Sequence, residues 1–309
     1  MNDRENMMTR REFATGALAA AVLPRTGFCG APAADLAERQ REIDEVTPAD
    51  YYAYLEKGKP QFAALKRLDA AFEKAVSEAR QEKVGKAPAI WLVYNMGLLV
   101  KTRETFFSVD LCHRLAPTLA KELDFALITH NHNDHYTRAF YRAMDGDEHK
   151  TVVNNFECNY GARSNPYHDG KPSEFGGGFT RGGKEFQFRD VSIRTSASDH
   201  NDYLIGFTMP FEISVGGFTL FHTGDTSRVE QLNPVRRPDL WVVHPRVGLS
   251  VAEGVKRFKP KTTVIAHLNE FTHPKDKYRW TWADGLEEQA KAESAGGKAV
   301  VPVWGERLV

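Results

Sequence analysis

The stretch ITHNHNDHY (residues 128–136) places three histidines and one aspartate within six positions. In an extended chain, side chains two positions apart point to the same side, so His130 and His132 can bind one metal ion together. Asp134 and His135 are adjacent and diverge, which suits a second metal beside the first. Imidazole and carboxylate groups are ligands that borderline divalent metals favour. Asp134 could also simply cap a helix, but four such residues in so short a stretch indicate a metal site.

The surrounding pattern is that of a mixed α/β domain. Short apolar segments that predict strands include FALIT (125–129), YLIGFTM (203–209) and AVVPVW (299–304). The strands come first in meanders and then alternate with helical segments such as VAEGVKRF (251–258). No linker or charge run divides residues 89–309 into independent domains.

The composition gives no sign of a nucleic-acid-binding, membrane-surface or disulfide-stabilised protein. The 309 residues include 41 Lys and Arg and 41 Asp and Glu, so the formal charge is zero. A neutral balance gives no sign of a nucleic-acid or anionic-membrane surface. The cysteines, Cys29, Cys112 and Cys158, are too few and too scattered for a disulfide framework or a cysteine zinc site.

Residues 1–33 have the pattern of a secretory signal peptide. The paired Arg10 and Arg11 precede an apolar run that is too short to span a membrane as a helix, and a small-residue cleavage site ends at Ala33. The segment TRREF resembles the twin-arginine export signal, which implies the twin-arginine machinery as a partner and a periplasmic or secreted location. The alternative is an ordinary amphipathic N-terminal segment.

Residues 34–84 predict a helical N-terminal extension. Thr47 can cap a helix whose first position is Pro48. The segment FAALKRLDAAFEKAV then repeats apolar residues on one helical face. Such an extension is either an arm packed across the main domain or a lid over a substrate site.

The motif His130-x-His132-x-Asp134-His135 resembles the signature of the metallo-β-lactamase superfamily. Later residues of that family's pattern follow in order after strand-like segments: His200 in SASDHND, Asp225 in FTLFHTGDTS and His267 in TTVIAHLNE. Asp110, at the end of FFSVD, resembles the family's early structural aspartate. One departure is YNMGLL (94–99), where relatives often have a Gly-His or Gly-Asn turn, and it leaves the nearby substrate edge open.

The resemblance implies an αββα four-layer sandwich for residues 85–309, with metals at one edge. It implies a first metal held by His130, His132 and His200. It implies a second metal held by Asp134, His135 and His267, with Asp225 bridging the two. The expected ions are Zn²⁺, with Mn²⁺ or Fe²⁺ as alternatives.

By the same resemblance, the expected function is that of a dinuclear metal-dependent hydrolase. A hydroxide bridging the metals would attack a small anionic ester, lactone or phosphodiester, because ions and ligands together leave about one net positive charge. Asp134 and His244 are the expected catalytic residues; His244 would protonate a leaving group or be a structural histidine. Sequence around His244 and His267 looks most like the lactonase and lipid phosphodiesterase branch. Thioester or β-lactam hydrolysis, and non-catalytic metal or ligand binding, remain alternatives.

Other residues bear on the expected chemistry and on the expected substrate contacts. Oxygen-reducing relatives have glutamate where this chain has His132, which favours hydrolysis over redox chemistry. His222 is a candidate for supporting a ligand, whereas His273 is given less weight. The Gly-rich segment 161–183, with Arg163 and Arg181, is expected either to bind an anionic substrate or to be a solvated loop. Neither a transmembrane span nor a nucleic-acid partner is expected, and the oligomeric state is left open.

Overall fold

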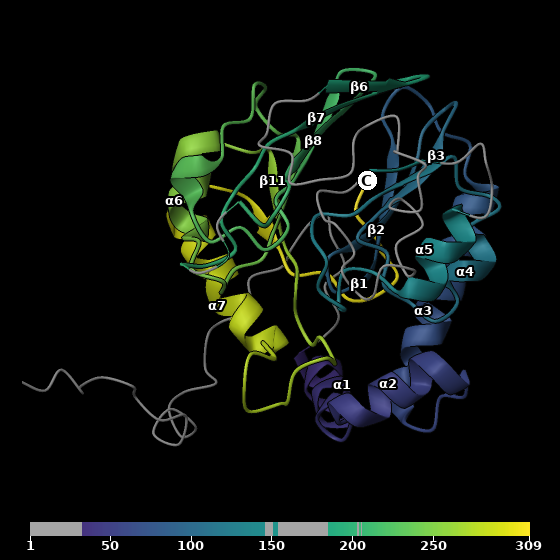
Figure 1. Ribbon diagram of the computed structural model, residues 1–309. Helices are drawn as coiled ribbons and strands as arrows, with labels where there is room; N and C mark the ends of the chain where they lie inside the picture. The colour runs from purple at the N-terminus through teal and green to yellow at the C-terminus, as the bar shows by residue number, and fades with distance from the viewer. Residues whose placement is uncertain (1–32, 146–150, 154–184, 203, 205) are drawn as a thin grey trace, which may run out of the picture.

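The computed structural model describes residues 33–145, 151–153, 185–202, 204 and 206–309. Two sheets lie face to face, and helices cover the outer face of each (Figure 1). The helices are α1 (Ala33–Asp44), α2 (Pro48–Lys57), α3 (Ala63–Gln81), α4 (Ala116–Leu119), α5 (Arg138–Asp145), the 3₁₀ turn η1 (Val229–Gln231), α6 (Val251–Phe258) and α7 (Trp282–Ser294). The four-layer arrangement expected from the sequence is present.

The first sheet has six strands and the second has seven. In spatial order the first contains β13 (Glu306–Arg307), β1 (Ala89–Tyr94), β2 (Gly97–Lys101), β3 (Phe106–Val109), β4 (Phe125–Leu127) and β5 (Thr151–Val153). The second contains β12 (Ala299–Val300), β11 (Thr262–Ile265), β10 (Leu240–Val243), β9 (Phe218–His222), β8 (Phe211–Val215), β7 (Val191–Thr195) and β6 (Glu185–Phe188).

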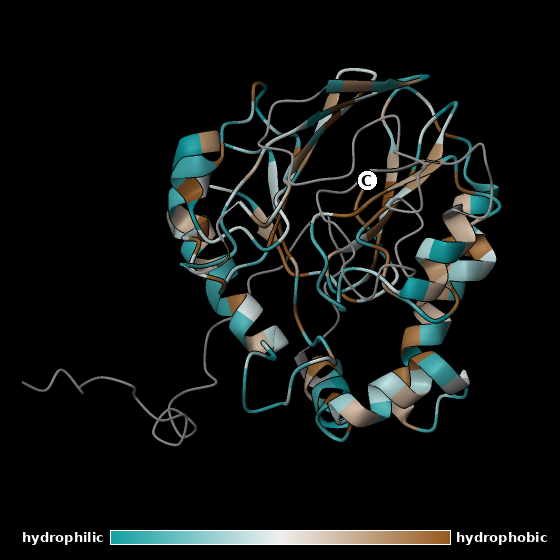
Figure 2. Cartoon of the chain, viewed as in Figure 1, coloured by the Kyte–Doolittle hydropathy of each residue, from teal (hydrophilic) through white to brown (hydrophobic). Residues whose placement is uncertain are grey.

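The core follows from the alternation of side chains along buried strands. In β1, Ile90 and Leu92 belong to the apolar layer between the sheets, which also contains Phe211 and Val242 from the second sheet. Trp91, one position along, belongs instead to the layer beneath the helices. Hydrophobic strands therefore lie between helices whose outer faces are hydrophilic, as Figure 2 shows. Within the described residues, no helix combines the length and apolar character needed to cross a membrane.

The N-terminal helices pack against the rest of the chain. Thr47 caps α2 through a reciprocal hydrogen-bond pair with Asp50, as the sequence predicts. Leu65, Leu68 and Phe72 of α3 are buried in the layer that also contains Trp91 of β1. These helices form a packed arm along the domain.

Two predicted strands differ from the structure. Of the predicted strand 203–209, the described residues contribute only an isolated bridge between Ser198 and Thr208. Gly206 has φ +62°, and its N–H donates to the carboxylate of Asp199, so the extended backbone is interrupted. The predicted strand 299–304 is limited to β12, because Pro302 lacks the N–H that a strand ladder needs.

The direction of the strands determines where the polar side chains gather. Strands β9 to β12 are mutually parallel, and β7 runs in the same direction because two antiparallel pairings separate it from β9. In the first sheet β3, β4 and β5 are parallel. The carboxyl ends of parallel strands lie at one edge of a sheet, which is where sites of open α/β folds form.

Candidate metal centre

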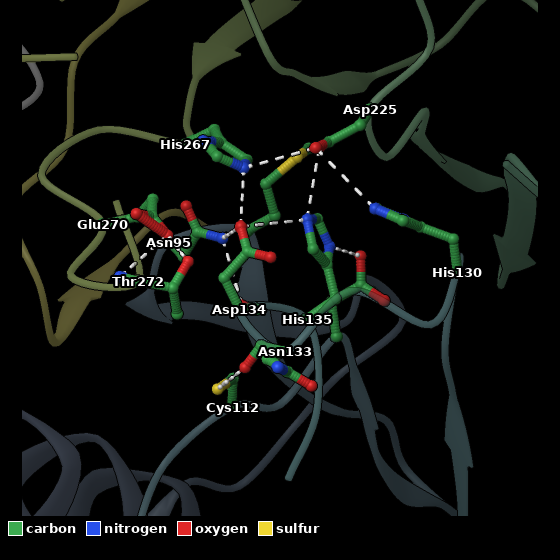
Figure 3. A network of polar contacts seen from close by, with 12 residues as sticks. Asn95, Cys112, His130, Asn133, Asp134, His135, Asp225, His267, Glu270 and Thr272 are labelled. Carbon is green, nitrogen blue, oxygen red and sulfur yellow. Dashed lines mark hydrogen bonds and ion pairs between the residues drawn. The ribbon is translucent and has the colours of Figure 1, made fainter. Parts of the chain in front are cut away.

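The predicted ligands come together in two groups that share one residue. In each group the potential ligand atoms all lie within 4.8 Å of one another. The first group is His130, His132, His200 and Asp225, and the second is Asp134, His135, His267 and Asp225. Each group contains the residues that the sequence analysis expects to hold one metal ion, and Asp225 belongs to both groups. Figure 3 shows Asp225 facing His130, His135 and His267.

The first group is drawn from two sheets. His130 and His132 follow β4, and their ring centroids are 4.6 Å apart. His200 comes from the loop after β7, and its ring lies 4.7 Å from His132. The His200 Nε2 is 3.4 Å from the Asp225 Oδ2, and the His130 Nε2 is 3.8 Å from the same oxygen.

The second group is more deeply buried. His267 Nε2 is 2.9 Å from Asp134 Oδ2 and 3.4 Å from Asp225 Oδ2. His135 Nε2 is 3.5 Å from Asp134 Oδ2 and 3.3 Å from Asp225 Oδ1. Asp225 thus presents Oδ1 to His135 and Oδ2 to His130, His200 and His267, so it faces histidines of both groups.

Asp110, at the end of β3, orients ligands of both groups. Its Oδ1 accepts the Thr129 N–H, and its Oδ2 accepts the Thr129 hydroxyl, each at 2.7 Å. Because that hydroxyl proton goes to Asp110, the Thr129 oxygen accepts from His130 Nδ1 at 3.0 Å. Asp110 Oδ2 also lies 2.9 Å from His135 Nδ1. Both histidines are thereby held with Nε2 free, the usual role of a carboxylate behind metal-binding histidines.

Asn95 is a contributor that the sequence reasoning missed. Its side-chain amide donates to the carbonyl and to the carboxylate of Asp134, each at 3.1 Å, and its own carbonyl accepts the His267 N–H at 3.2 Å. It lies in the YNMGLL turn, with φ +55°, a conformation that asparagine tolerates. A short polar side chain in a tight turn between two strands was the available signal.

Gly224 allows Asp225 to approach the first sheet. It has φ +52°, and a Cβ at this position would lie 2.8 Å from the side chain of Thr129. The turn therefore requires glycine both for its backbone conformation and for the close contact.

Electrostatics keep both carboxylates ionised. Burial alone would raise the pKa of Asp225, but His267 and His135 lower it well below its usual range. Burial likewise opposes ionisation of Asp134, and His135 and His267 again lower its pKa. Burial would lower the pKa of His267, yet Asp225 and Asp134 raise it to about 10. Metal binding requires charged carboxylates and neutral imidazoles, so a bound ion would displace the proton that the two carboxylates otherwise hold on His267.

The unpaired nitrogen atoms fit divalent metals. Among the residues that the structure describes, buried Nε2 atoms of four histidines lack a hydrogen-bond partner: His130, His135, His200 and His267. A buried polar atom without a partner is costly, and coordination to a metal would remove that cost. Histidine nitrogens and carboxylate oxygens are a donor set that Zn²⁺, Mn²⁺ and Fe²⁺ all accept.

The other histidines occupy distinct places. His244 follows β10 and stacks on His267, with ring centroids 3.8 Å apart and planes 6° from parallel. His222 is fully buried; its Nε2 lies 2.9 Å from the Met96 carbonyl and its Nδ1 4.0 Å from Asp110 Oδ2, so it lies behind the ligands. His273 is half-exposed and pairs with Glu270.

Three sequence-based predictions lie outside the described residues. They are the signal peptide (1–33, of which only the last residue is described), Cys158, and the Gly-rich segment 161–183 with Arg163 and Arg181.

Comparisons with known proteins bear on the fold and on the class of the chain. No protein-family model matches the sequence. A UPF0173 metal-dependent hydrolase from Pelotomaculum thermopropionicum is 28% identical over 183 residues, covering 50% of this chain and 72% of the relative.

Solved structures share the architecture at low identity. A possible metal-dependent hydrolase from Veillonella parvula aligns with a TM-score of 0.54 and 13% identity, over 72% of this chain and 99% of that chain. A metallo-beta-lactamase fold protein from Bacillus subtilis aligns with a TM-score of 0.52 and 14% identity, over 71% and 98% respectively. This chain has the metallo-β-lactamase fold.

Proposed function

We propose that this chain is a metal-dependent hydrolase that uses two divalent ions, Zn²⁺ first among the candidates. The observation that carries the proposal is the convergence of seven ligand residues into two groups that share Asp225. The similarity to a metal-dependent hydrolase from Pelotomaculum thermopropionicum supports the same class. A protein that had kept only the fold would be expected to have lost at least one of these ligands.

The residues of the chain would hold and orient the metals. His130, His132 and His200 would bind one ion, Asp134, His135 and His267 would bind the other, and Asp225 would serve both. Divalent ions in such a site supply Lewis acidity and lower the pKa of bound water, so no serine or cysteine nucleophile is needed.

His244 is the proposed hydrogen-bond donor to the leaving group. Its Nδ1 accepts the backbone N–H of Arg246 at 3.3 Å, which places the proton of the neutral ring on Nε2. The ring is buried against His267 and is thus fixed in orientation. The acceptor of this hydrogen bond would be the leaving-group oxygen of the substrate.

The proposed substrate is a small anionic ester, lactone or phosphodiester. Two divalent ions with the ionised Asp134 and Asp225 leave a positively charged site, which favours anions. The neutral overall charge of the chain offers no basic track for a polymer. Arg163 and Arg181 of segment 161–183 remain predicted contacts to such a substrate.

The test is an activity screen of metal-loaded protein. We expect turnover of at least one member of a panel of phosphodiesters, lactones, thioesters and β-lactams. Chelation should abolish the turnover, and added Zn²⁺, Mn²⁺ or Fe²⁺ should restore it. Metal-loaded protein that turns over no ester of any class would contradict the proposal and favour a metal-binding role.

We also propose export through the twin-arginine machinery and a periplasmic or secreted location. The proposal is supported by the paired Arg10 and Arg11 before an apolar run. Because this route carries folded cargo, metal could be bound before export.

A further inference from the structure

The loop after β11 holds a histidine–glutamate pair that the metal centre does not use. Glu270 is fully buried, and His273 Nδ1 lies 3.0 Å from its Oε1. The side chain of His273 is 42% exposed. Within the described part of the chain, His273 is the ion-pair partner of this buried carboxylate.

The loop itself fixes the orientation of the pair. The Glu270 carboxylate accepts the backbone N–H groups of Thr272 at 3.1 Å and His273 at 2.7 Å, and also accepts the Thr272 hydroxyl. Its oxygens are thus occupied by donors of its own turn. A buried carboxylate requires a compensating cation, and the partly exposed His273 ring meets that need.

Hydrogen bonds of residues at and after the end of β1 connect this loop to the candidate metal ligands. The Tyr94 hydroxyl accepts the Phe271 N–H at 2.6 Å, and the next residue, Asn95, holds both Asp134 and His267. Figure 3 shows Glu270 and Thr272 beside Asn95 and Asp134. The pair therefore belongs to the same polar network as the second metal group.

The charges around His273 agree with this location. The Glu270 hydrogen bond raises the pKa of His273 and outweighs burial; Asp134 raises it further, whereas His267 lowers it. Arg279 Nε donates to the backbone carbonyl of His273 at 2.9 Å. The Tyr278 ring packs edge-on against the His273 imidazole, with ring centroids 5.7 Å apart. The imidazole thus lies within electrostatic reach of two metal ligands without contacting either.

We propose that His273, oriented by Glu270, is a substrate-binding residue that presents an imidazolium to the anionic group of the substrate on the Asp134 side of the metal centre. This inference rests on the proposed function and adds a specificity residue to it. Glu270 is a positioning residue, because it acts through His273. A charge-assisted hydrogen bond of this kind is strong enough to change binding by about 10- to 100-fold.

The test compares His273→Gln and Glu270→Gln with the wild type. His273→Gln should raise KM for bis(4-nitrophenyl) phosphate about 10- to 100-fold and change kcat little, because the contact serves binding. Hydrolysis of the neutral 4-nitrophenyl acetate should be unchanged. Lys277→Gln is the matched control, since it removes an exposed cation from the same loop, and should leave KM unaltered.

The pH dependence separates a binding role from a structural one. Wild-type KM for the anionic ester should rise as pH increases through the pKa of His273. Glu270→Gln removes the partner that raises that pKa, so the rise should move to lower pH. In His273→Gln, the KM for the anionic ester should no longer rise with pH in this range.

A binding measurement keeps this inference separate from the proposed function. Calorimetry with inorganic phosphate and metal-loaded protein should show a Kd about 10-fold weaker in His273→Gln at pH 6, with unchanged metal content. If the wild type hydrolyses nothing but this difference appears, the proposed function fails and the binding role stands. An unchanged KM and an unchanged phosphate Kd in His273→Gln would overturn the inference.

Discussion

The side-chain amide of Asn95 donates to both the backbone carbonyl and the carboxylate of Asp134, each at 3.1 Å. One residue directly after β1 thus orients a candidate metal ligand that lies beyond β4. Its backbone carbonyl also accepts the His267 N–H, so two ligands of the second group depend on the same turn.

Replacing Asn95 with alanine should weaken the second metal site. Loss of both hydrogen bonds frees the Asp134 carboxylate, and removal of such orienting partners lowers metal affinity about 10- to 100-fold. Competition with a chromophoric chelator measures both affinities. Asn233→Ala, at an exposed position, is the control. Equal affinities in Asn95→Ala and the wild type would show that Asp134 needs no such support.

The convergence of the candidate metal ligands could be predicted because their signals are local. His130 and His132 lie two positions apart after a strand, and Asp225 and His267 each follow an apolar strand segment. The contribution of Asn95 could not be predicted, because its contact with Asp134 spans 39 residues and depends on how β1 and β4 lie in the sheet.

The missed elements have similar causes. The predicted strand 203–209 has a strand-like composition, but its geometry is decided by Gly206, which has a positive φ and whose N–H donates to the Asp199 carboxylate. The pairing of Glu270 with His273 is short in sequence, but the burial of Glu270 depends on packing that a local pattern does not contain. The layered fold was implied by the resemblance that the histidine motif carries, whereas strand and helix periods indicated only a mixed α/β domain.

The buried His113 should make the protein sensitive to acid. Burial lowers its pKa to about 3, against the opposing effect of Asp69. Below pH 6.5 the unfolded chain binds a proton that the native ring does not, so stability falls as pH decreases from about 6.5 to 3. At pH 5 this single group should lower the free energy of unfolding by about 2 kcal/mol.

Denaturant unfolding at pH 7.5 and pH 5 tests this. His113→Phe keeps the ring that stacks on Phe72 at 4.3 Å and removes the titrating group. The variant should lose stability at both pH values, because Tyr54 and the Leu115 N–H lose a neighbour. The free energy of unfolding should fall from pH 7.5 to pH 5 by about 2 kcal/mol less in the variant than in the wild type. The same pH dependence in both proteins would refute the assignment.

Arg279 should hold the N-terminal extension to the loop after β11. Its guanidinium is buried and donates to the carbonyls of Ile43 at 3.2 Å, Val46 at 2.8 Å and His273 at 2.9 Å. Arg279→Met should destabilise the protein by about 3 kcal/mol, since several buried acceptors lose a charged donor. Hydrogen exchange should then accelerate in α1 and α2 first. The exposed Arg257→Met is the control, and protection of α1 and α2 equal to the wild type would contradict this role.

Lysine at both Arg10 and Arg11 should retain the precursor in the cytoplasm. The twin-arginine receptor requires the paired guanidinium groups, for which lysine does not substitute geometrically. Fractionation and immunoblotting measure the distribution. Arg25→Lys, after the apolar run, is the matched control and should be exported normally. An unchanged exported yield from the double variant would rule out this route.

Elemental analysis of fully loaded, dialysed protein tests whether two metals share Asp225. The arrangement of seven ligands in two groups predicts about two divalent ions per chain in the wild type. Asp225→Ala should retain about one at most, because both groups lose a ligand. A wild-type protein that holds no more than one ion per chain when fully loaded would contradict the dinuclear site.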